Sequence, residues 1–154
     1  MLKHLLVLFL LVSACVTIHG LGMILGLRWL TRAWPQDEHH FSLPHTFWIL
    51  IRVVFGLLLL HLLQIFVWAA FYDLGGCFQD FSTSLYFSAT SYSTVGYGDV
   101  VLPTAWRVLG PIEAVTGILM FGWSTGVLFA VVNRLVRHFI KDPADLPPDS
   151  TQAM

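Results

Sequence analysis

Apolar residues gather into three long runs along the chain, separated by polar segments. The runs cover about residues 5–27, 46–71 and 108–135. A helix of about 20 apolar residues crosses the hydrocarbon core of a bilayer, which is about 30 Å thick. Each run therefore predicts a transmembrane helix, and the pattern predicts an all-α membrane protein.

The first run also invites comparison with a cleaved signal sequence. Lys3 and His4 form a short charged start, and residues 12–15 loosely resemble a lipoprotein cleavage box. However, the apolar stretch continues past Cys15 to Leu27, which is longer than the roughly 7–15 residues of a signal core. We expect a retained helix, with removal of residues 1–14 as the alternative.

The segment between the second and third runs, residues 72–107, is more than a connecting loop. After a Gly-Gly turn, aromatic and apolar residues recur at helical spacing in residues 78–90, at Phe78, Phe81 and Leu85. This stretch is too short to span a membrane, so it predicts a re-entrant half-helix. Asp80, or Ser82 in its place, would cap its start.

Residues 28–45 predict a polar loop with some interfacial helix near Trp29 and Trp34. It contains the pair His39-His40, which we interpret as solvated because no further metal ligands accompany it. The final residues 138–154 are rich in Pro and Asp and predict a short disordered tail.

Composition supports a lipid environment. The 154 residues are 56% hydrophobic and 11% charged, against about 25% charged in soluble domains. The net charge of −1 gives no reason to expect a nucleic-acid partner. Two cysteines are too few for a disulfide framework or a zinc site, and no nucleophile–base pattern predicts an enzyme.

Basic residues predict the orientation in the cell membrane. They flank the first loop and follow the third run, whereas residues 72–102 contain no Lys or Arg. Positively charged loops remain in the cytoplasm. We therefore expect a multi-pass protein whose C-terminus is cytoplasmic and whose N-terminus and segment 72–102 face outside.

Thr94-Val95-Gly96-Tyr97-Gly98 directly follows the expected half-helix. A dehydrated cation needs rings of oxygen ligands, and glycines permit the backbone angles that turn carbonyls toward one axis. Non-helical backbone at membrane depth is tolerated where it lines a water-filled path or is buried in protein. One copy supplies a quarter of a ring, so the pattern predicts a pore in a homotetramer.

With this motif in place, residues 46–137 resemble the pore domain of the potassium channel family, which has an outer helix, a pore helix, a filter and an inner helix in this order. The motif matches the family signature without departure. The resemblance implies a selectivity filter at Thr94, Val95, Gly96, Tyr97 and Gly98, with K⁺ sites at the first four. K⁺ would be the permeant ion, with no cofactor. Residues 1–45 add one N-terminal helix and a loop to this module.

The resemblance also implies supporting roles. Asp99 matches an acid just outside the filter that bonds to a pore-helix aromatic, and Tyr86 and Phe87 match the aromatic pair around the filter. Thr90 stands where several family members have a glutamate that pairs with that acid. The effect of that pair on inactivation therefore cannot be carried over to this chain.

Three residues in the apolar runs call for an interpretation. Glu113 should face protein or water, because a buried charge costs about 2.5–3.5 kcal/mol on insertion scales. We expect it to support the filter through pore-helix hydroxyls such as Ser88, Ser91 or Thr90, with a snorkelling acid as the alternative. Gly117 is a candidate gating hinge or a close-packing site. His61 is expected to be neutral and bonded to a neighbouring helix, rather than a pH sensor.

These features predict a potassium-selective channel subunit that conducts passively and whose partners are lipid and its own copies. No span carries the ladder of arginines that a voltage sensor needs. Two alternatives remain: a non-conducting subunit of another channel's tetramer, and a repeat of a larger cation transporter.

Overall fold

The computed structural model describes residues 2–33 and 43–139, and all of its regular structure is helical. The elements are α1 (Leu2–Ala33), α2 (Leu43–Leu74), α3 (Phe81–Tyr92), the 3₁₀ turn η2 (Thr104–Trp106) and α4 (Leu109–Phe139). The segments Leu5–Arg32, Thr46–Leu74 and Thr104–Arg137 are long and apolar enough to cross a membrane. The expected all-α chain with three membrane-capable helices is therefore confirmed.

Helix α1 is longer than the sequence pattern predicted. We expected a loop from residue 28 onward, but the helix continues to Ala33. Residues 28–33 contain no helix breaker, Arg32 favours the negative end of the helix dipole, and Leu30 is buried against α2 and α4. The predicted loop and tail are also shorter than expected, because α2 already begins at Leu43 and α4 continues to Phe139. Trp34, the pair His39-His40 and residues 140–154 lie outside the described residues.

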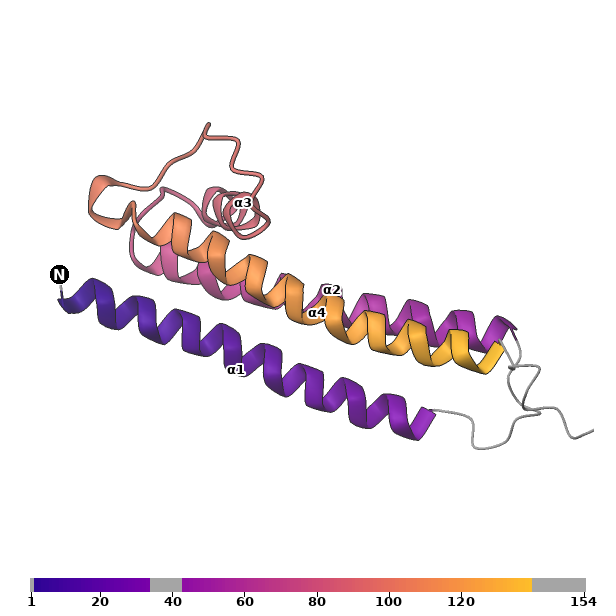
Figure 1. Ribbon diagram of the computed structural model, residues 1–154. Helices are drawn as coiled ribbons and strands as arrows, with labels where there is room; N and C mark the ends of the chain where they lie inside the picture. The colour runs from indigo at the N-terminus through magenta and orange to yellow at the C-terminus, as the bar shows by residue number, and fades with distance from the viewer. Residues whose placement is uncertain (1, 34–42, 140–154) are drawn as a thin grey trace, which may run out of the picture.

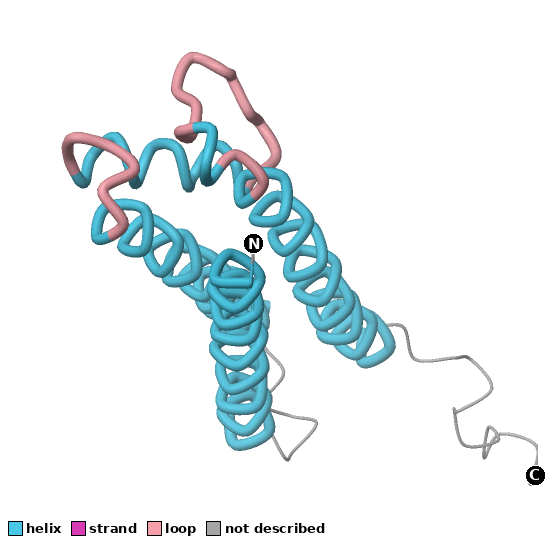
Figure 2. The backbone as a smooth tube through the Cα atoms, turned by 90° about the vertical axis from the view of Figure 1, so that its left-hand side faces the viewer, coloured by secondary structure: helices cyan, strands magenta, loops and turns pink. Residues whose placement is uncertain are grey.

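The three long helices run side by side, with α2 antiparallel to α1 and α4 (Figure 1). Helix α1 contacts both α2 and α4. The short helix α3 lies across one end of the bundle, in contact with α2 and α4 (Figure 2). The N-terminus of α1 lies at this same end. The segment that follows α3 is therefore held at one end of a helical frame.

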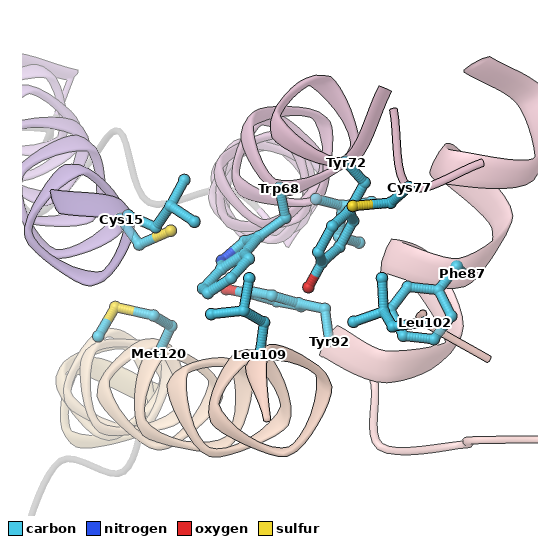
Figure 3. Packing of buried hydrophobic residues seen from close by; sticks show 11 residues of the cluster. Cys15, Trp68, Tyr72, Cys77, Phe87, Tyr92, Leu102, Leu109 and Met120 are labelled. Atoms are coloured by element: carbon cyan, nitrogen blue, oxygen red, sulfur yellow. The ribbon is translucent and has the colours of Figure 1, made fainter. Parts of the chain in front are cut away.

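Aromatic residues form the core beneath α3. Trp68 and Tyr72 on α2 and Tyr92 on α3 are fully buried, and Cys15 of α1 and Met120 of α4 close the cluster (Figure 3). At the other end a smaller aliphatic cluster joins the three long helices. The outer faces of these helices expose many large apolar side chains, among them Phe9, Leu25, Phe55, Leu59, Leu119 and Phe129. Such faces are suited to lipid or to other copies of the chain.

Candidate functional site

The end of α3 leads directly into the motif at residues 94–98. Ser93 caps the helix, and the Thr94 N–H donates to the Ser91 carbonyl over 2.9 Å. The Gly96 N–H donates to the Thr90 carbonyl over 3.0 Å. The N–H groups of Thr94 and Gly96 therefore bond to carbonyls in the last turn of α3.

The backbone of the motif alternates in handedness. Thr94, Gly96 and Gly98 have φ angles of 64°, 52° and 78°, whereas Val95 and Tyr97 are not in the positive-φ region. This region suits glycine and is uncommon for a residue such as Thr94. Residues whose φ alternates in sign can turn their N–H groups to one side of a chain. The carbonyl oxygens can then take the other side, where they are free to act as ligands.

Helix α3 begins at the expected cap. The Asp80 side chain accepts hydrogen bonds from the Thr83 N–H (2.8 Å) and the Thr83 hydroxyl (2.9 Å). The backbone bond lowers the pKa of this exposed carboxyl. The helix starts at Phe81 and ends at Tyr92, so it is shifted by two or three residues from the predicted range of 78–90.

The two aromatic neighbours on α3, Tyr86 and Phe87, lie in different surroundings. The Tyr86 hydroxyl donates to Asp99 over 2.8 Å and ties α3 to the residue just after the motif. This bond raises the pKa of Tyr86. Phe87 is buried in the core beside Tyr72, with ring centroids 5.3 Å apart. The Thr90 hydroxyl bonds back onto its own helix.

Glu113 lies fully buried between α2 and α3. Its carboxyl oxygens lie 2.8 Å from the Tyr72 hydroxyl and 2.5 Å from the Ser88 hydroxyl, one of the partners expected for it. Ser88 Oγ also lies 2.8 Å from the Ile65 carbonyl, which can only accept. A hydroxyl has one proton, so Ser88 fills both contacts when its own proton goes to Ile65 and a protonated Glu113 donates the second. The two contacts therefore favour a neutral Glu113.

The chain is similar to one family of known proteins. The model of a family described as "Ion channel" matches residues 46–134, more than half of the chain. The chain belongs to this ion channel family. No curated protein and no solved structure matches it. The match begins within α2 and ends within α4, and it leaves α1 outside.

Family membership and the three spans make this chain a multi-pass membrane transport protein. Within the channel, Gly117 is a close-packing site. A Cβ atom there would overlap the carbonyl oxygen of Tyr92 and lie 3.3 Å from its ring. Helix α4 can approach the end of α3 only because this position has no side chain, and it runs unbroken through Gly117. A role of Gly117 as a gating hinge stays a prediction.

The expected bonding of His61 to neighbouring helices is confirmed, since its ring nitrogens contact Tyr92 of α3 and Ser124 of α4. Sequence reasoning did not assign roles to His19, Gln64 or Tyr72, all of which are fully buried and hydrogen-bonded in the channel. Their polarity was a usable signal in the sequence, because polar residues inside apolar spans tend to face protein rather than lipid. The pattern alone did not say which residues meet.

Proposed function

We propose that the channel is a potassium-selective pore formed by four copies of the chain, with residues 94–98 as its selectivity filter. The observation that carries this proposal is the alternating backbone at Thr94, Gly96 and Gly98. Four such segments around one axis would surround a dehydrated ion with rings of carbonyl oxygens. The Thr94 hydroxyl would add a ligand at the inner end.

Exposure of the motif in the single chain supports assembly. Val95 and Tyr97 are 53% and 73% exposed, although both are largely apolar. An added Cβ atom at Gly96 would meet no other atom within 4 Å. Side chains of this kind need a partner that covers them, and neighbouring copies around a fourfold axis would supply it.

Charge around the motif favours cations. The segment from residue 72 to 102 carries Asp73, Asp80 and Asp99 and no basic residue. Acidic groups at the mouth of a pore raise the local concentration of cations. Helix α3 would add the partial negative charge of its C-terminal end, which leads into the motif.

The same distribution supports an orientation. Basic residues at the far end of the bundle, such as Arg28, Arg52 and Arg134, favour the cytoplasm. The motif and the N-terminus would then face outside. The described spans carry their arginines near their ends, which disfavours gating by a voltage sensor.

Reconstitution of the purified channel into liposomes tests the proposal. A K⁺ gradient should drive efflux from wild-type vesicles, and a matched Na⁺ gradient should drive far less. Gly96→Ala should abolish the K⁺ flux, because alanine rarely adopts the φ angle of 52° found at this position. The added methyl group would clash with no atom of the same chain, so the loss would come from the backbone conformation. Gly26→Ala, on a helix face with open space, should leave the flux unchanged.

Failure would take two forms. Equal K⁺ and Na⁺ fluxes would contradict a carbonyl filter. No flux from wild-type vesicles would contradict conduction by this chain alone and favour a non-conducting subunit.

A further inference from the structure

Five buried polar side chains from α1, α2, α3 and α4 form one closed ring of hydrogen bonds. None of the five is more than 6% exposed. Around the ring the contacts are Gln64 Nε2 to His19 Nδ1 (2.9 Å), His19 Nε2 to Ser124 Oγ (3.3 Å), Ser124 Oγ to His61 Nε2 (3.0 Å), His61 Nδ1 to the Tyr92 hydroxyl (3.2 Å) and that hydroxyl to Gln64 Oε1 (3.0 Å).

The direction of the ring is set at Gln64. Its amide nitrogen also donates to the Leu60 carbonyl over 3.2 Å, which fixes the nitrogen on one side and the oxygen on the other. The amide N–H therefore donates to Nδ1 of His19. The amide oxygen accepts from the Tyr92 hydroxyl, whose only proton is used in this bond.

The remaining protons then follow in turn. Because the Tyr92 oxygen can now only accept, His61 carries its proton on Nδ1 and leaves Nε2 as an acceptor. Ser124 donates to that nitrogen and accepts from Nε2–H of His19. Within the ring every group thus donates once and accepts once, with both imidazoles neutral. A fully satisfied buried network of this kind holds its members in one arrangement.

One member of the ring stands next to the proposed filter in the chain. Tyr92 is the last residue of α3 and stands two positions before Thr94. Its hydroxyl belongs to the ring, and its carbonyl lies against Gly117 of α4. A shift of Tyr92 would therefore move the start of the motif.

Only one member of the ring comes from outside the family match. His19 belongs to α1, whereas the other four residues lie within residues 46–134. Two of the ring's bonds, those to Gln64 and Ser124, depend on His19. The helix that is extra to the family module therefore completes a network that includes Tyr92, two positions before the motif.

We propose that His19 is a positioning residue for the filter: α1 closes the ring, and the ring fixes Tyr92 and with it the inner end of residues 94–98. This inference rests on the proposed function. It gives α1, which lies outside the family match, a part in ion selection.

A double-mutant cycle tests it. His19→Phe keeps an aromatic ring but opens the network at α1, and Tyr92→Phe opens it at α3. The readout is the ratio of K⁺ to Na⁺ flux in liposomes, because loss of folded protein lowers both fluxes without changing their ratio. Thr17→Val is the matched control, since it removes a hydroxyl of α1 that bonds only to its own helix.

We expect each single variant to lower the flux ratio about threefold or more, the size of an average interhelical hydrogen bond in a membrane protein. The double variant should be no worse than Tyr92→Phe alone, and Thr17→Val should match wild type. If His19→Phe does not assemble, His19→Asn replaces it, because the shorter side chain keeps an acceptor beside Gln64 and ends before Ser124.

Three results would overturn the inference. A selective wild-type channel whose ratio is unchanged by the His19 variants, or effects that multiply in the double variant, would refute the role of α1 and leave the proposed function intact. Wild-type vesicles without K⁺ selectivity would refute the proposed function first, and this inference with it.

Discussion

Substitutions at Glu113 test whether this buried acid is neutral or charged in the folded channel. In Glu113→Ala the Tyr72 hydroxyl loses its acceptor and Ser88 loses the donor that faces it. A buried polar group left without its partner costs about 1–3 kcal/mol, and the void left by the side chain adds to this cost. We therefore expect Glu113→Ala to destabilise the channel by about 2–4 kcal/mol.

Glu113→Gln should behave differently. A glutamine is nearly isosteric with a protonated glutamate, so its amide oxygen can accept from Tyr72 and its amide N–H can donate to Ser88. We expect the loss of stability to stay below about 1 kcal/mol, the net value of a typical hydrogen bond. K⁺ flux should be retained in the same variant.

Thermal unfolding in detergent, together with the amount of assembled channel by size-exclusion chromatography, measures both variants. Thr116→Val is the control, because Thr116 lies on the same helix and its hydroxyl bonds back to Ile112 of that helix. If Glu113→Gln were as damaging as Glu113→Ala, the site would need a negative charge, and the neutral-acid interpretation would be wrong.

Three further substitutions have defined outcomes. Gly117→Ala should lower thermal stability and K⁺ flux, because the new methyl group overlaps the end of α3, whereas Gly26→Ala should preserve both. Asp80→Asn should be less stable than wild type at neutral pH. The folded state lowers the pKa of Asp80 below its ordinary 3.8. The greater stability of the wild type should therefore be lost as the pH falls through this lowered pKa, which a series of thermal melts would measure. Tyr86→Phe, which removes the bond to Asp99, should make K⁺ flux decay faster without changing assembly.

Each of these has a contrary result. Wild-type behaviour of Gly117→Ala would mean that α4 is not held against α3. A difference between Asp80→Asn and wild type that persists in acid would remove the charged cap as its cause. A steady flux in Tyr86→Phe would show that the bond to Asp99 does not support the filter.

The sequence predicted the features that depend on local pattern. The three spans followed from apolar length, and the cap at Asp80 followed from its place before an apolar repeat. The motif at residues 94–98 stood out because glycines at alternate positions relieve a backbone constraint. Glu113 drew notice because a lone acid in an apolar run needs a partner.

Features that depend on distant contacts could not be predicted. His19 and Ser124 are separated by 105 positions, and neither is distinctive alone. The packing role of Gly117 depends on where the end of α3 lies, which periodicity does not give. The extension of α1 to Ala33 reflects burial of Leu30 against α2 and α4, a tertiary effect that outweighed the polar composition of that stretch.

The most direct test of a four-copy carbonyl filter is a cryo-electron-microscopy map of the channel in lipid nanodiscs in K⁺ buffer. The map should show four copies around one axis, with ion density in line between the carbonyls of residues 94–98. A monomer, a different symmetry, or carbonyls turned away from the axis would contradict it.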